Sequence, residues 1–117
     1  MSDDELVLRA FREHADLSHA EMRALVTMIL NRNRNPRPHY EGGWEVVAGG
    51  LGYEVPEPPA HLDTSADAAE VRKRRDSIYR NTRRTIRSLR DKGAIRTVST
   101  GGWYGNSLYA ILPKATS

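Results

Sequence analysis

The chain has 117 residues, of which 38% are hydrophobic and 28% are charged, so a single domain with a modest core is expected. It has no cysteine, which excludes disulfides and thiolate metal sites and fits a cytoplasmic setting. Its start is acidic and its longest apolar run is far too short to cross a bilayer, so neither a signal peptide nor a membrane span is expected.

Two helices are predicted at the start of the chain, each opened by a capping box. Ser2 with Glu5 predicts a helix from Asp3 to about His14, and Ser18 with Glu21 predicts a second from residue 19 to about residue 31. The spacing of three and four residues selects the side chains expected to be buried, namely Leu6, Ala10 and Phe11 in the first helix and Met22, Leu25, Val26, Ile29 and Leu30 in the second. The second helix is the more apolar and is expected to be the centre of the core.

The middle of the chain is predicted to be mostly loop. Residues 31–43 hold three Asn, two Pro and two Gly; their arginines, Arg32, Arg34 and Arg37, either touch phosphates or, more simply, are solvated. A short helix is expected from Trp44 to about Gly49, followed by a turn over residues 50–52, with Trp44, Val47 and Leu51 facing the core. Residues 54–63 form a Pro-rich loop, because proline has no backbone N–H to donate.

One long helix is predicted over residues 64–93. Thr64 with Asp67 forms its start signal, and Gly93 suits a left-handed cap at its end. Its apolar or small residues follow helical spacing: Ala68, Val71, Ile78, Thr82, Thr85, Ile86 and Leu89. Arg75 interrupts this stripe, so the first half of the helix either packs poorly or forms a separate short helix.

The positive charge of the protein is concentrated on this helix. Residues 65–92 carry ten Lys or Arg and four acids, a net charge of +6, whereas the whole chain carries +3 and the remainder therefore −3. Arg80, Arg83, Arg84 and Arg87 fall on neighbouring turns, and Asn81 is expected to lie among them. Arginine pairs with guanine or phosphate, and asparagine with adenine, so this face suits nucleic acid. The alternative is an ordinary solvated face.

A β-hairpin is predicted after Gly93. Residues 94–100 and 107–112 are rich in β-forming side chains, and a Gly-containing loop with Trp103 and Tyr104 separates them. In the second strand, Leu108, Ala110 and Leu112 share one face. Together with the helices, this hairpin predicts a mainly α fold with a small C-terminal β-hairpin, formed by residues 1–117 as one domain.

The order of a helix, a short helix ending at Leu51-Gly52, a basic helix and a hairpin resembles the winged helix-turn-helix domain of bacterial, phage and plasmid regulators and replication initiators. Further residues resemble the recognition helix, its exit and the return strand of that family: Thr82, Ile86, Leu89, Gly93, Ile95 and residues 106–109. The family has a short turn before the recognition helix. Here about 20 residues, 54–75, intervene, so the recognition helix is either extended at its N-terminus or preceded by an insertion.

The resemblance implies that the basic helix enters the major groove of double-stranded DNA while the wing lies along the backbone or minor groove. The residues expected to contact DNA are Arg80, Asn81, Arg83, Arg84, Arg87, Arg96, Trp103, Tyr104 and Asn106. The expected role is transcriptional regulation, or an accessory role in replication or recombination. A homodimer is left open: the stripe of Ala68, Val71 and Ile78 either forms a dimer surface or packs on the N-terminal helix of the same chain.

Two other binding functions remain open. On a winged-helix scaffold, Trp103 and Tyr104 could anchor a protein partner, or they could stack on single-stranded DNA or RNA. An enzyme is not expected, because the four histidines lack ligand spacing and no phosphate-binding or nucleophile motif is present. No cofactor and no metal site are expected.

Overall fold

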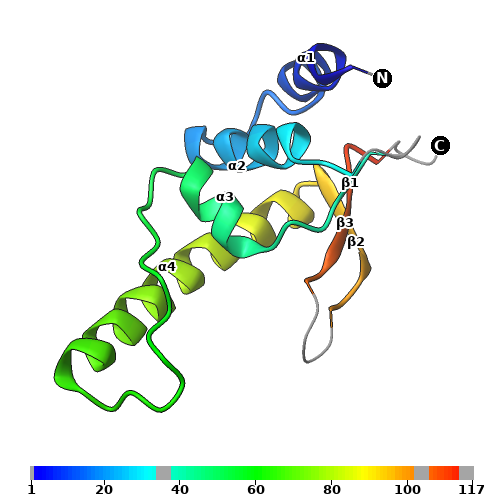
Figure 1. The fold of residues 1–117 in the computed structure, drawn as a ribbon. Helices are drawn as coiled ribbons and strands as arrows, with labels where there is room; N and C mark the ends of the chain where they lie inside the picture. The colour runs from blue at the N-terminus through cyan, green and yellow to red at the C-terminus, as the bar shows by residue number, and fades with distance from the viewer. Residues whose placement is uncertain (1, 34–37, 102–105, 114–117) are drawn as a thin grey trace.

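The computed structural model describes residues 2–33, 38–101 and 106–113, which form four helices and a small antiparallel sheet (Figure 1). In chain order the elements are α1 (Asp3–Glu13), α2 (His19–Leu30), β1 (His39–Tyr40), α3 (Trp44–Gly50), α4 (Ala66–Asp91), β2 (Ile95–Ser99) and β3 (Leu108–Ile111). The prediction of a mainly helical fold with a C-terminal hairpin is confirmed at this level.

The helix ends follow from local capping. Ser2 and Ser18 cap α1 and α2 as predicted, and Ser18 with Glu21 completes a reciprocal capping box. The predicted cap of α4 is wrong by one residue, because the hydroxyl of Ser65, not Thr64, accepts from the amide of Ala68 at 3.1 Å. Gly93 has a φ of 80°, the left-handed conformation that was expected to end α4.

Strand β1 lies inside the segment that was predicted to be loop. It pairs antiparallel with β3, with His39 opposite Ala110 and Tyr40 opposite Tyr109. The Tyr40 side chain is only 1% exposed, and its hydroxyl donates to the carbonyl of Gly43 at 2.7 Å. Two residues are too few to show a period of two, so only the pairing with a strand 70 positions away reveals β1.

The sheet has the strand order β1–β3–β2. Tyr109 and Ile111 of β3, the partners of Thr97 and Ile95 of β2, belong to the core cluster. Leu108 and Ala110 alternate with them along the strand and share a face as predicted, and Ala110 is 7% exposed. Leu112 also joins the core because it has left the strand, with a φ of 46°. The hairpin therefore closes the core beside the C-terminal end of α4.

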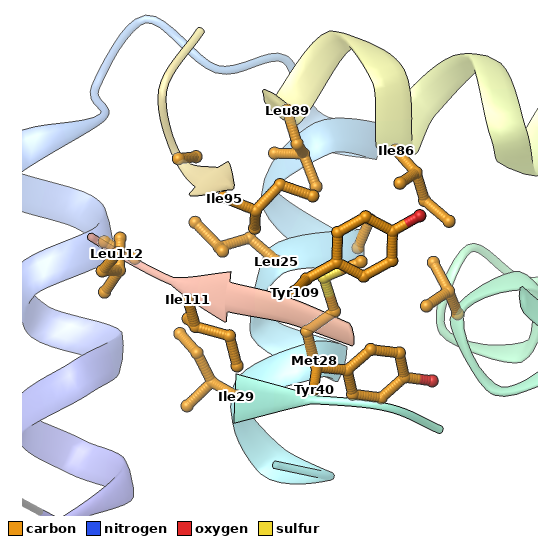
Figure 2. Packing of buried hydrophobic residues seen from close by; sticks show 14 of the residues in the cluster. Leu25, Met28, Ile29, Tyr40, Ile86, Leu89, Ile95, Tyr109, Ile111 and Leu112 are labelled. Atoms are coloured by element: carbon orange, nitrogen blue, oxygen red, sulfur yellow. The ribbon is translucent and has the colours of Figure 1, made fainter. Parts of the chain in front are cut away.

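Helix α2 is the centre of the core, as expected. Figure 2 shows its Leu25, Met28 and Ile29 facing the residues contributed by α4 and the sheet. Two predictions are wrong, since Phe11 is 54% exposed and Leu30 is 57% exposed. Helix α2 packs against α1, α3 and α4. These neighbours bury Ala24 and Met28, which were not predicted to be buried, whereas Met22 and Val26, which were, are only half-buried.

Helix α4 is continuous over 26 residues, and its first half projects from the body of the molecule (Figure 1). The Pro-rich loop runs back beside this half, and the molecule is elongated, at 53 × 27 × 23 Å. Ala68 and Ile78 are buried within the chain, at 3% and 5% exposure, and α4 packs chiefly against α2 and α3. Packing of this stripe on the N-terminal helix is therefore wrong, whereas the dimer surface stays a prediction.

Arg75 does not break the packing of α4. Its side chain is only 16% exposed, and its guanidinium lies 3.4 Å from the Glu45 carboxylate and 5.4 Å from the centre of the Trp44 ring. It also donates to the carbonyl of Pro56. Arg75, which interrupts the apolar stripe, thus ties the first half of α4 to α3 and to the Pro-rich loop.

Candidate nucleic-acid interface

The side of α4 that faces away from the core carries a row of basic residues. Side chains on an α-helix rotate by about 100° per residue, so Lys73, Arg80 and Arg87, seven residues apart, point in nearly the same direction. Arg84 lies one turn after Arg80. All four are exposed; the Arg80 side chain is 68% exposed, and Asp76 pairs with it at 3.2 Å. We call Lys73, Arg80, Arg84 and Arg87 the basic face.

Arg83 and Arg90 lie on one flank of this face, next to the sheet. Arg83 is half-buried, with its guanidinium 6.0 Å from the centre of the Tyr79 ring. It lines a hollow of about 130 Å³ whose walls include Tyr40, Tyr109 and Asn106. Arg87 and Arg90 border Tyr109 in a smaller hollow of about 20 Å³. An arginine among aromatic rings is held in place, so Arg83 is more fixed than its neighbours on the basic face.

Tyr79 is part of this flank and was not among the predicted residues. Its ring meets Trp44 edge to face at 5.3 Å and lies beneath Arg83. The sequence signal was the spacing of four residues between an aromatic and an arginine on one helix. Tyr79 thus links the flank that carries Arg83 to α3.

Asn81 is exposed, but it does not lie among the arginines. Seven residues return a helical side chain to within about 20° of the same direction, which places Asn81 on the flank of Ser88. The hydroxyl of Ser88 donates to Glu21 of α2. Asn81 therefore lies on the α2 side of the helix, whereas Arg83 lies on the sheet side.

Glu21 anchors this second flank. Its carboxylate is buried and accepts from the ammonium of Lys92 at 2.8 Å, the backbone N–H of Ser18 at 2.7 Å, and Ser88. Burial raises the pKa of Glu21, but the hydrogen bonds from Lys92, Ser88 and Ser18 outweigh it and lower the pKa to about 2. Lys92 is consequently committed to an intramolecular ion pair, although it counts toward the charge of the segment.

The residues of the hairpin that were expected to contact DNA have separate positions. Arg96 is exposed on β2, opposite Ala110 of β3, while its neighbour Ile95 is buried in the core. Trp103 and Tyr104 lie outside the described residues. The Asn106 side chain donates to the carbonyl of Glu41 at 3.2 Å. Asn106 thus joins the segment before β3 to the segment before α3, and its contact with DNA stays a prediction.

The arginines expected in the loop after α2 lie apart from the basic face. Arg32 donates to the carbonyl of Ile29 at 3.0 Å and pairs with Asp3 of α1. This pairing ties the end of α2 to the start of α1. Arg34 and Arg37 lie outside the described residues.

Another hollow is separate from the basic face. It measures about 650 Å³ and lies among α1, α2 and the end of α3, with Phe11, Leu17, Met22 and Val26 in its walls. None of the four residues of the basic face lines it. The described residues bring together no group of His, Asp or Glu suited to a metal ion. None of the helices in residues 2–33, 38–101 and 106–113 is long and apolar enough to cross a membrane.

No family model matches the chain, and no match is found among curated proteins or solved structures. The candidate surface consists of a continuous helix with an exposed basic face, an arginine beside an aromatic ring on one flank, and a hairpin beside the C-terminal end of the helix. Such a surface can bind a polyanion, and its arginines have the donor geometry for base edges as well as phosphates.

Proposed function

We propose that the protein is a sequence-specific double-stranded DNA-binding protein with a winged helix-turn-helix fold. Helix α4 is the recognition helix, and the β2–β3 hairpin is the wing. The role is that of a transcriptional regulator, or of a replication or recombination accessory factor of the phage or plasmid type. The observation that carries the proposal is the exposed row of Lys73, Arg80, Arg84 and Arg87 on a single helix.

The charge distribution supports the proposal. The Arg84 and Arg87 side chains make no hydrogen bond or ion pair within the described residues, so they are available to a partner. Arg83 and Tyr79 hold the flank in place, which lowers the entropy cost of ordering it on DNA. Phosphate contacts would supply affinity, and arginine contacts with base edges would supply specificity.

The first experiment selects bound duplexes from a pool with a randomised 20-base-pair core and then measures affinity by fluorescence anisotropy. The proposal expects an enriched sequence that binds more tightly than its scrambled control. Arg84→Ala and Arg87→Ala should each weaken binding to the enriched duplex by roughly tenfold or more, as expected for about 1–3 kcal/mol per base-reading arginine.

Arg12→Ala is the matched control, because Arg12 is an exposed arginine on α1, outside the basic face. Its affinity should stay within about twofold of the wild type. Arg84→Lys separates the two kinds of contact: retained affinity with less discrimination between enriched and scrambled duplexes indicates base reading. No enrichment, together with equal affinities of the wild type, Arg84→Ala and Arg87→Ala, would overturn the proposal.

A further inference from the structure

Helix α4 is longer than contact with base edges requires. At about 1.5 Å per residue, its 26 residues extend roughly 39 Å, and Lys73 lies roughly 21 Å from Arg87 along the axis. The major groove is about 12 Å wide and curves around the duplex. A straight helix whose C-terminal half follows that groove must therefore carry its first half over the flanking sugar-phosphate backbone.

The first half of α4 is held in place by the Pro-rich loop. Arg72 donates to the carbonyl of Ala60 at 3.1 Å, and Arg75 donates to that of Pro56. At the start of the helix, Asp63 accepts from the Ser65 amide at 2.9 Å. Both arginines are engaged in holding the loop against the helix, so they are poorly placed to leave it for a ligand.

Lys73 is the basic residue of this half that shares the direction of Arg80 and Arg87. It is exposed and has no hydrogen bond or ion pair within the described residues. Arg74, the next residue, points about 100° away, toward the flank of Asn81. On the side of Lys73, α4 begins with the small residues Ala66 and Ala69, which allow close approach to a backbone.

We infer that Lys73 forms a second, sequence-independent DNA contact, with a phosphate outside the base pairs read by the C-terminal half of α4. This inference rests on the proposed function and specifies the length of DNA that it covers. The Pro-rich loop acts as a brace that fixes the distance between the two contacts. A lysine suits this position because it binds phosphate as a point charge and reads no base.

The test compares Lys73→Ala with Arg74→Ala on the enriched and scrambled duplexes. The two variants remove the same charge from adjacent exposed positions of one helix, and alanine preserves helicity, which circular dichroism verifies. Lys73→Ala should weaken binding to both duplexes by the same factor, roughly three- to tenfold, and reduce the salt slope by about 1. Arg74→Ala should stay within about twofold of the wild type.

A shortened duplex locates the contact. Stepwise removal of base pairs from the side nearer the N-terminus of α4 should reach a length at which the wild type binds no better than Lys73→Ala, while Arg84→Ala still binds more weakly than both. A deficit of Lys73→Ala that persists at every length retaining the enriched site would overturn the flanking position.

The remaining outcomes separate this inference from the proposed function. Equal affinities of Lys73→Ala and Arg74→Ala would overturn the second contact, while weakened Arg84→Ala and Arg87→Ala would still support DNA reading. Unchanged binding in all four variants would instead refute the proposed function itself.

Discussion

At the scale of single residues, charged groups on α4 differ in function although the sequence presents them as one class. Arg75 and Lys92 are committed to contacts inside the molecule, with Glu45 and Glu21 respectively. Arg84 and Arg87 have no such contact within the described residues. The residues that stabilise the fold and those offered to a partner thus occupy different sides of one helix.

Glu21 is expected to make stability depend on pH. Its folded-state pKa of about 2 lies below the ordinary 4.5, so its contribution is fully present above pH 4.5 and is lost as the pH falls through 2. The shift corresponds to about 3 kcal/mol at neutral pH. Glu21→Gln should therefore lower the free energy of unfolding at pH 7 by about 2–3 kcal/mol, with a smaller deficit at pH 3.

Urea unfolding at the two pH values measures this effect. Glu57→Gln is the control, because Glu57 is an exposed acid of the Pro-rich loop and should change stability by less than about 0.5 kcal/mol. An equal deficit of Glu21→Gln at pH 3 and pH 7 would show that the glutamate acts through packing rather than through its charge.

At the scale of elements, the contact between α2 and α3 depends on a glycine. A Cβ added at Gly50 would overlap the Thr27 hydroxyl and lie 2.8 Å from the Thr27 Cβ. Thr27 is fixed, because its hydroxyl donates to the carbonyl of Arg23 at 2.7 Å. At the preceding residue, Gly49, an added Cβ would meet no atom within 4 Å.

These neighbouring glycines give a matched pair of substitutions. Gly50→Ala should destabilise the fold by about 1–3 kcal/mol, since it forces α2 and α3 apart. Gly49→Ala should be neutral or stabilise by up to about 1 kcal/mol, because alanine favours the helix. Urea midpoints of the two variants measure the difference, and equal midpoints would show that α3 adjusts freely on α2.

At the scale of the whole molecule, the net charge of +3 understates the positive electrostatic potential at the surface that a DNA duplex would approach. The basic face is positive, while the residues outside 65–92 sum to −3. If the four residues of the basic face each neutralise about one phosphate, the slope of log affinity against log salt should be near −4, from about −0.9 per phosphate.

Anisotropy titrations of the wild type on the scrambled duplex, from about 0.05 to 0.3 M salt, measure this slope. A slope near zero with affinity retained would indicate a binding surface other than the basic face. Sedimentation at the same protein concentrations tests the homodimer, which stays a prediction.

The sequence by itself determined the features that depend on residues close together in the chain. The capping boxes, the apolar spacing and Gly93 defined α1, α2 and the end of α4, and the change to β-rich segments defined the hairpin. The concentration of positive charge on residues 65–92 was also visible, because it requires only counting and helical geometry.

Only the tertiary structure decided which faces of these elements are buried and which charges are free. Strand β1 exists because β3 pairs with it, and Phe11 is 54% exposed because α1 packs chiefly against α2, on one side only. Arg75, Lys92 and Asn106 are residue types that commonly contact nucleic acid. Within this molecule, however, their partners are Glu45, Glu21 and Glu41 respectively. These pairings join positions from 30 to 71 residues apart, a separation at which local propensity carries no information about contact.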